Sequence, residues 1–426
     1  MVPRFRHAPA RELSPDELPW PLKFILIILG YSTVVVPVAV LIYYYKKRVI
    51  ETNSVPRSYW SRIVHLFAIG DPQSRGFEVL NVPTSPPKDD EETNNKFFKD
   101  VVLLLFYFAG IQTTLVLMGF LQERIITQGY ARFDDGTMIE KFGDAQFLVF
   151  CNRIIALFIC FIVLYISWSR QPPHVPPLYV HSYTSFSNTM SSWCQYEALK
   201  YVSFPTQTIC KASKVVATMF MGRVVRGQRY TWAEYGLGGV IAIGASLFLL
   251  STGGGSVEET TTTTSISGLI LMAGYLVFDA FTLNWQKSLF DLKPKVSKYQ
   301  MMLGVNVFSA ILCFVSLLEQ GTLFTSTKFL NDHANISSDI FFLSLSGATG
   351  QLFIYSTIEK FGPIVFAVIM TIRQMLSILL SSIYYSHPMT IWASAGFMIV
   401  FGALFIDIYR RYFEKKTKTH GQKTQA

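Results

Sequence analysis

Two basic residues lie inside long apolar runs of the sequence, where a charged side chain is costly. Lys214 follows Pro205 by nine positions, which is about 13–14 Å along a helix axis. Arg373 follows Pro363 by ten positions, or about 15 Å. Each cation at the centre of a membrane helix costs roughly 2.5–3.5 kcal/mol, and Lys211 lies one turn from Lys214 on the same face. The three cations therefore need a counter-ion.

Phosphate is the anion that suits these cations, because Lys and Arg both form charge-assisted hydrogen bonds to its oxygens. Carboxylates are few at that depth, since Glu197 and Asp279 are expected in the outer thirds of their helices. The alternative is a structural ion pair with Glu197, Asp279 or Glu359. The residue types favour a phosphate site and leave the ion pair open.

Three of the apolar runs carry polar side chains that recur every three or four residues, so that each set lines one helix face. Lipid does not tolerate such a face, which predicts a water-filled cavity, with hydrogen bonding between helices as the alternative. The sets are His181, Ser185, Asn188, Ser192 and Gln195 in the run 178–200, Ser344, Gln351 and Tyr355 in 339–358, and Gln374, Ser377 and Ser381 in 362–385.

These residues lie within a chain of 426 residues that is half hydrophobic and 15% charged, whereas a soluble protein carries roughly 25% charged residues. Apolar runs of about twenty residues alternate with short charged loops, and each run can cross a membrane. The predicted spans are 22–45, 98–121, 146–168, 178–200, 203–222, 233–251, 266–285, 299–318, 339–358, 362–385 and 389–408. The fold class is predicted to be an all-α polytopic membrane protein.

The loops divide into a basic set and a neutral or acidic set that alternate with the spans. The basic set lies in the cytosol by the positive-inside rule, so the net charge of +9 does not indicate nucleic-acid binding. The C-terminus is then cytosolic, and the glycosylation sequon at Asn335 lies on the other side. The basic set includes Lys46, Lys47, Arg48, Arg226, Lys287, Arg410 and Arg411, and the other includes Asp134, Asp144, Glu258 and Asp332.

The ten later spans form two related sets of five. Tyr196 precedes Lys214 by 18 positions, and Tyr355 precedes Arg373 by 18 positions. Because five crossings are an odd number, the two sets have opposite orientation, as in the inverted repeats of secondary transporters. The predicted divisions are an N-terminal segment with an extra transmembrane helix and linker (1–97), the first repeat (98–251), a luminal connector (252–265), the second repeat (266–409) and a basic tail (410–426).

Several stretches of the chain resemble the drug/metabolite transporter superfamily, and within it the Golgi nucleotide-sugar transporters. The resemblance is closest to the branch that carries 3′-phosphoadenosine 5′-phosphosulfate (PAPS). It covers nearly all of residues 98–408. The stretches are GFLQERI, DAQFLVFCNRI, SSWCQYEALKYVSFPTQTICKASKVVATMFMG, SGLILMAGYLVFDAFTLNWQKSLF, QMMLGVNVFS, SLLEQG and GQLFIYSTIEKFGPIVFAVIMTIRQMLSILLS.

The resemblance implies ten core helices and antiport of a nucleotide donor into the lumen against a spent nucleotide. In relatives, a basic residue in the fourth and in the ninth helix holds the phosphates, which Lys214 and Arg373 match here. Guanosine-sugar relatives carry a paired-asparagine motif where this chain has only Asn306, which argues against that cargo. The predicted substrate-binding residues are Lys214, Arg373, Lys211, Gln374, Tyr196, Gln195, Asn188, Tyr355, Gln351 and Asn306.

The cargo expected from the resemblance is PAPS, exchanged for its 3′,5′-bisphosphate product or a related adenine nucleotide, across the Golgi membrane or that of the endoplasmic reticulum. A homodimer is considered as the assembly, and no catalytic residue, metal or cofactor is expected. The alternatives are a UDP-sugar transporter of the same fold, a membrane-embedded transferase, and a receptor or chaperone without transport.

This topology can be tested in intact microsomes. We expect a C-terminal tag to be removed by added protease, and we expect Asn335→Gln to abolish any shift in gel mobility on glycosidase treatment, because Asn335 is on the luminal side. A tag protected from protease until detergent is added would contradict the predicted orientation.

Overall fold

The computed structural model describes residues 19–52, 58–70, 90–127, 129–132, 139–167, 171–198, 200–202, 204–252, 266–292, 295–333, 335–384 and 390–423. Contacts divide the chain into two units, Met1–Ile69 and Gly70–Ala426. The first unit contains α1 (Trp20–Thr52) and α2 (Tyr59–Ala68). The Tyr45 hydroxyl of α1 donates to the Ser61 carbonyl of α2 at 3.4 Å. The apolar length of α1 agrees with the extra transmembrane helix that the sequence predicts.

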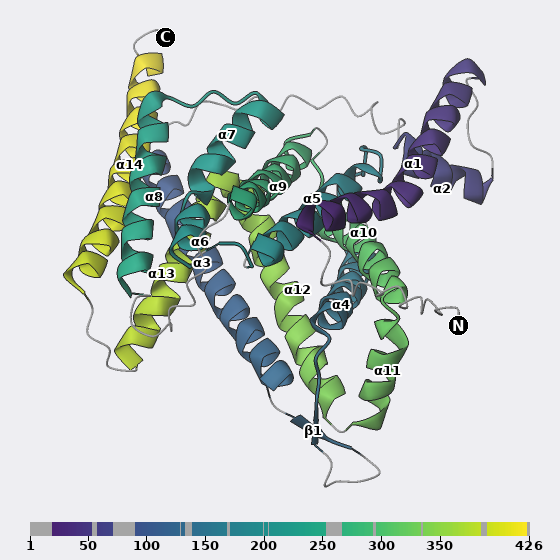
Figure 1. Ribbon diagram of the computed structural model, residues 1–426. Coiled ribbons are helices and arrows are strands. Elements are labelled where there is room, and N and C mark those ends of the chain that lie inside the picture. Colours follow the sequence, from purple (N-terminus) through teal and green to yellow (C-terminus); the bar gives the residue numbers. More distant parts are fainter. Residues whose placement is uncertain are drawn as a thin grey trace, which may run out of the picture. The chain divides into compact units, whose positions relative to one another are not determined.

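The second unit is built of helices, with one small antiparallel hairpin among its described residues (Figure 1). Its elements are α3 (Asp90–Thr127), β1 (Gly129–Ala131), β2 (Ile139–Lys141), α4 (Ala145–Ile166), α5 (Val180–Ala198), α6 (Phe204–Ala212), α7 (Lys214–Arg226), α8 (Trp232–Thr252), α9 (Ile266–Phe290), α10 (Lys298–Glu319), α11 (Thr322–Asp332), α12 (Ile336–Phe361), α13 (Pro363–Tyr384) and α14 (Ile391–Lys423).

The all-α polytopic fold class is confirmed. Within the described residues, seven helices are long and apolar enough to cross a membrane: α1, α3 from Phe98, α4, α8, α9, α10 and α13. The remaining predicted spans correspond to the more polar α5 and α12, to α6 with α7, and to α14, whose apolar part is Ile391–Asp407. The arrangement as two inverted five-helix repeats stays a prediction.

The structure differs from the sequence prediction in several places. Ser213 interrupts the predicted fourth core helix, and its hydroxyl bonds to the Ile209 carbonyl at 2.9 Å. The short helices α2 and α11 and the hairpin were not predicted, since they lie in loops between apolar runs. The predicted linker around Val82–Asn95 is helical from Asp90, and its earlier part lies outside the described residues, as does most of the predicted connector 252–265.

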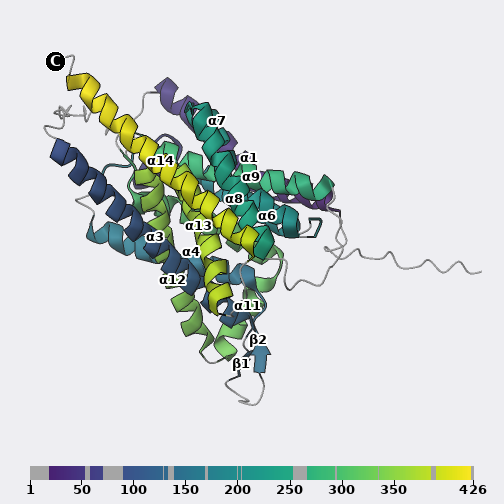
Figure 2. The ribbon, with the colours of Figure 1, turned by 90° about the vertical axis from the view of Figure 1, so that its left-hand side faces the viewer.

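The helix packing pairs elements from the two predicted repeats. α5 packs on α9 and α12 on α3, while α4 packs on α10 and α8 on α14. Figures 1 and 2 both show α8 and α14 side by side along one edge. Gly396 permits this approach, because a side chain there would meet the Gly244 carbonyl oxygen and the Phe248 nitrogen, both at 2.6 Å. Each of these helices thus packs against a helix of the other predicted repeat.

Some helix ends contact each other in the structure, and the sequence places the members of each contact on the same side of the membrane. At the end that holds the hairpin and α11, the Tyr130 hydroxyl donates to Asp339 at 2.9 Å, and Arg124 lies 3.6 Å from the same carboxylate. Burial and this hydrogen bond raise the pKa of Tyr130. At the opposite end, Lys360 lies 3.1 Å from Asp100. These contacts agree with the sides assigned to the helix ends that make them, and the topology of the whole chain stays a prediction.

The Asp339 contacts should stabilise the hairpin end of the bundle. We expect Asp339→Ala to lower the free energy of unfolding by about 1–3 kcal/mol, because the buried Tyr130 hydroxyl loses its acceptor. Asp332→Ala is the matched control, because its ion pair with Arg132 is half-exposed and should contribute about 0–1 kcal/mol. Thermal unfolding of the purified protein measures both. Equal losses would contradict this assignment.

Candidate functional site

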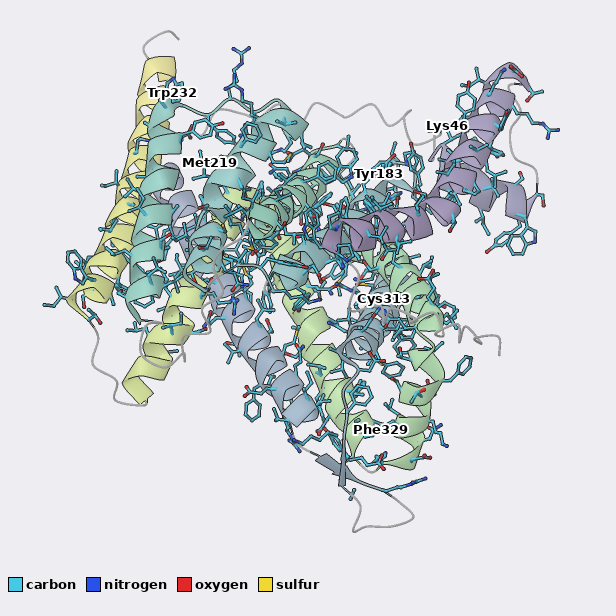
Figure 3. All side chains as sticks on the ribbon, in the orientation of Figure 1. Lys46, Tyr183, Met219, Trp232, Cys313 and Phe329 are labelled. Carbon is cyan, nitrogen blue, oxygen red and sulfur yellow. The ribbon has the colours of Figure 1, made fainter. Side chains whose placement is uncertain are left out.

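A cavity of about 410 Å³ lies among five helices of the second unit. Its size is that of a small-molecule binding site. Figure 3 shows the side chains on the ribbon, with Trp232 at the start of α8 at the margin, where it is 92% exposed. The lining residues are Asn188, Ser191, Ser192 and Gln195 of α5, Lys211 of α6, Lys214 of α7, Tyr275 and Asp279 of α9, and Met370, Thr371, Arg373 and Gln374 of α13.

The three predicted cations converge on this cavity. Lys211 and Lys214 reach it from the first predicted repeat, and Arg373 reaches it from the second. The Arg373 Nε atom is buried without a hydrogen-bond partner among the described residues. Neither Arg373 nor Lys211 has a carboxylate partner there either. Two of the three cations are therefore available to an anion that enters the cavity.

Lys214 has an internal partner, which is one of the alternatives that the sequence left open. Its Nζ atom lies 2.8 Å from Asp279 Oδ2, and both side chains are mostly buried. The expectation that Asp279 lies in an outer third of its helix is wrong, because α9 continues to Phe290 and places Asp279 near its middle. The cavity therefore carries one carboxylate against three cations.

Some polar side chains of α5 line the cavity, and others form hydrogen bonds to neighbouring helices. Asn188, Ser192 and Gln195 line the cavity. Ser185 instead donates to the Val305 carbonyl of α10 at 2.7 Å, and Ser187 donates to the Phe278 carbonyl of α9 at 2.6 Å. The cavity prediction and the hydrogen-bonding alternative thus each describe some of the serines and asparagines on this helix.

Four predicted binding residues do not line the cavity. Tyr196 is 68% exposed on the outside of α5. Asn306 and Gln351 form a second polar cluster, in which the Asn306 amide donates to Gln351 Oε1 at 2.8 Å. Arg153 of α4 donates to Asn306 Oδ1 at 3.2 Å. Tyr355 is buried beside Arg153. The binding prediction for these four residues stays untested.

Sequence reasoning missed Arg153, although a basic residue inside the apolar run 146–168 was a usable signal. Arg153 and Asn306 each lie eight residues past the first residue of a 22-residue helix, in α4 and α10 respectively. These two helices occupy equivalent places in the predicted repeats. Tyr275 of α9 also lines the cavity, where an aromatic ring can stack on a base.

The histidines near the polar faces contact each other rather than the cavity. The Nε2 atoms of His174 and His181 lie 3.0 Å apart, and neither residue lines the cavity. Burial lowers the pKa of His174. A transferase would require a general base beside its acceptor, so this arrangement does not favour the transferase alternative.

Comparison with known proteins identifies the class. The model of the UAA transporter family matches residues 103–411, so the chain belongs to this family, and the resemblance to nucleotide-sugar transporters is confirmed. The chain is 62% identical over 416 residues to adenosine 3′-phospho 5′-phosphosulfate transporter 1 of Caenorhabditis elegans, covering 96% of each chain. It is 40% identical to the Homo sapiens protein of that name, covering 92% of this chain and 88% of that one.

A more distant relative is named for a different cargo. The chain is 36% identical over 313 residues to UDP-galactose/UDP-glucose transporter 5 of Arabidopsis thaliana, covering 73% of this chain and 87% of that one. All of these relatives are named as transporters, so the chain is a transporter and not an enzyme.

Because Lys214 has a carboxylate partner and Arg373 has none among the described residues, the two alanine variants should differ in their free energy of unfolding. We expect Lys214→Ala to lower the free energy of unfolding by about 1–3 kcal/mol, less than the ~3–5 kcal/mol of a fully buried pair, because it leaves Asp279 without its cation beside a cavity. Arg373→Ala removes a cation that has no carboxylate partner in the described structure and should be nearly neutral.

Thermal unfolding of the purified variants without nucleotide measures this difference. The double variant Lys214→Ala/Asp279→Asn should recover most of the loss. A large destabilisation by Arg373→Ala would show that Arg373 has a structural role instead.

Proposed function

We propose that this chain is an antiporter that moves PAPS from the cytosol into the Golgi lumen, in exchange for adenosine 3′,5′-bisphosphate or a related adenine nucleotide. The observation that carries the proposal is the convergence of Lys211, Lys214 and Arg373 on one cavity. The names of the relatives with 62% and 40% identity support PAPS as the cargo. The cargo would supply the sulfate donor for sulfation in the lumen.

The number of cations supports a ligand with phosphates at two positions. PAPS carries a 3′-phosphate of about −1.5 to −2 in addition to its phosphosulfate. Lys211, Lys214 and Arg373 reach the cavity from α6, α7 and α13 respectively, so there are enough cations for two anionic groups. Arg373 offers a planar fork that matches phosphate oxygens. Tyr275 is the aromatic residue placed to contact the adenine.

The cavity lies between the two predicted repeats, since α5, α6 and α7 belong to the first and α9 and α13 to the second. Rocking of one repeat against the other would expose such a site to each side of the membrane in turn. A UDP-sugar is the second candidate cargo, favoured by the 36% identical relative. Its diphosphate offers fewer anionic positions for the three cations. The cytosolic C-terminus and a glycan at Asn335 belong to this proposal.

Transport in liposomes tests the proposal. Purified protein in liposomes preloaded with adenosine 3′,5′-bisphosphate should take up labelled PAPS, and UDP-glucose should not compete. Arg373→Ala should reduce uptake about ten- to hundredfold, since one charge-assisted contact contributes roughly 1.5–3 kcal/mol. Arg373→Lys should be intermediate, because it keeps the charge and loses the planar fork.

Arg229→Ala is the matched control, because Arg229 is exposed in the loop after α7, outside the cavity. It should transport like the unmodified protein. Uptake that needs no internal nucleotide would refute antiport, and competition by UDP-glucose but not by the bisphosphate would replace PAPS with a UDP-sugar as the cargo.

A further inference from the structure

An anionic side chain projects into a cavity that is otherwise suited to an anion. Asp279 lies four residues after Tyr275, so both side chains share one face of α9 and line the cavity. The Asp279 Oδ2 atom lies 2.8 Å from Lys214 Nζ, and the Asp279 side chain is 20% exposed. Of the residues that line the cavity, Asp279 alone is acidic. A carboxylate here repels phosphate and occupies one of its cations.

Several hydrogen bonds besides this ion pair join α9 to its neighbours. On the α5 side, Ser191 donates to the Tyr275 carbonyl at 3.2 Å and Ser187 to the Phe278 carbonyl at 2.6 Å. On the α7 side, the Asn284 amide donates to the Thr218 carbonyl at 2.9 Å. These bonds hold α9 on both sides of Asp279. The carboxylate is therefore available for a role other than joining helices.

We propose that Asp279 is an internal competitor of the cargo: it neutralises Lys214 in the empty carrier, and a phosphate group of the nucleotide displaces it. This inference rests on the proposed function. One anion replaces another at Lys214, so this cation is compensated at membrane depth in the empty and in the loaded carrier. The exchange at Lys214 contributes little net binding, because a Lys–phosphate contact replaces a similar Lys–carboxylate contact and leaves Asp279 without its cation.

Net binding must then come from the cations that have no internal partner among the described residues, Lys211 and Arg373. A nucleotide with phosphates at two positions can displace Asp279 and also bind these two cations. A ligand with a single diphosphate has fewer groups for the same task. Asp279 therefore makes the cavity selective for the more highly charged nucleotide.

Asp279→Asn tests the inference through the sign of its effect. The amide is of similar size but does not neutralise Lys214 and does not repel phosphate. We expect the variant to bind adenosine 3′,5′-bisphosphate about tenfold more tightly, which is ~1.4 kcal/mol. The affinity for UDP-glucose should rise only about threefold. UDP-glucose carries about half the charge of the bisphosphate, and its repulsion by Asp279 is proportional to that charge.

Calorimetric titration of the purified full-length protein with each nucleotide measures these affinities. Asp332→Asn is the matched control, since it removes the same charge from an ion pair at the hairpin end, outside the cavity, and should leave both affinities unchanged. Without nucleotide, Asp279→Asn should melt below the unmodified protein, because Lys214 is unpaired. With the bisphosphate, its rise in melting temperature should exceed that of the unmodified protein.

Each other outcome overturns a distinct statement. Unchanged or weaker bisphosphate binding by folded Asp279→Asn would make Asp279 a positioning group for Lys214 and would refute the competitor role, while the proposed function stands. If Asp279→Asn does not fold, Asp279→Ser is expected to show the same tightening, and failure of both to fold would assign the carboxylate to stability. If the unmodified protein neither binds nor exchanges adenine nucleotides, the proposed function fails and the inference fails with it.

Discussion

A cation at the middle of a membrane must be kept away from lipid, and the arrangement of this bundle follows from that constraint. Lys211 and Lys214 lie on either side of the break at Ser213 between α6 and α7, Arg373 lies near the middle of α13, and all three face one cavity. The helix that supplies most of the polar lining, α5, is itself too polar to face lipid and packs against α9 and α10. More apolar helices such as α4, α8 and α10 can form the surface that lipid meets. The bundle thus has a polar centre and an apolar exterior.

The fold was largely predictable, because hydrophobicity determines where a membrane helix runs. The predicted and observed limits of α8, α10 and α13 agree within two residues. The predicted end of α9 falls five residues short, at 285 rather than Phe290, because its last turn is polar. Because of this error, the sequence predicted Asp279 in an outer third of its helix, whereas it lies near the middle. The depth of Asp279 in the membrane, and therefore its ion pair with Lys214, could not be derived from a helix boundary of that accuracy.

The site was predictable in part, because periodicity identifies a helix face and not the neighbour that the face meets. Six of the predicted residues line the cavity: Asn188, Gln195, Lys211, Lys214, Arg373 and Gln374. Asn306 and Gln351 have the same character, and they face Arg153 of α4 instead. Only the packing of α4 against α10 and α12 separates the two polar groups, and residue spacing contains no information about that packing.

The contact between Arg153 and Asn306 has a kinetic consequence. In a carrier whose two predicted repeats rock against each other, a contact between equivalent positions of the two repeats would act as a fulcrum, and Arg153 of α4 and Asn306 of α10 make such a contact at 3.2 Å. A fulcrum moves little between the inward-open and outward-open states. A perturbation there alters the barrier between these states in both directions by the same factor and leaves their equilibrium unchanged. Contacts at one end of the bundle that break when that end opens would, by contrast, shift the equilibrium toward the state that keeps them.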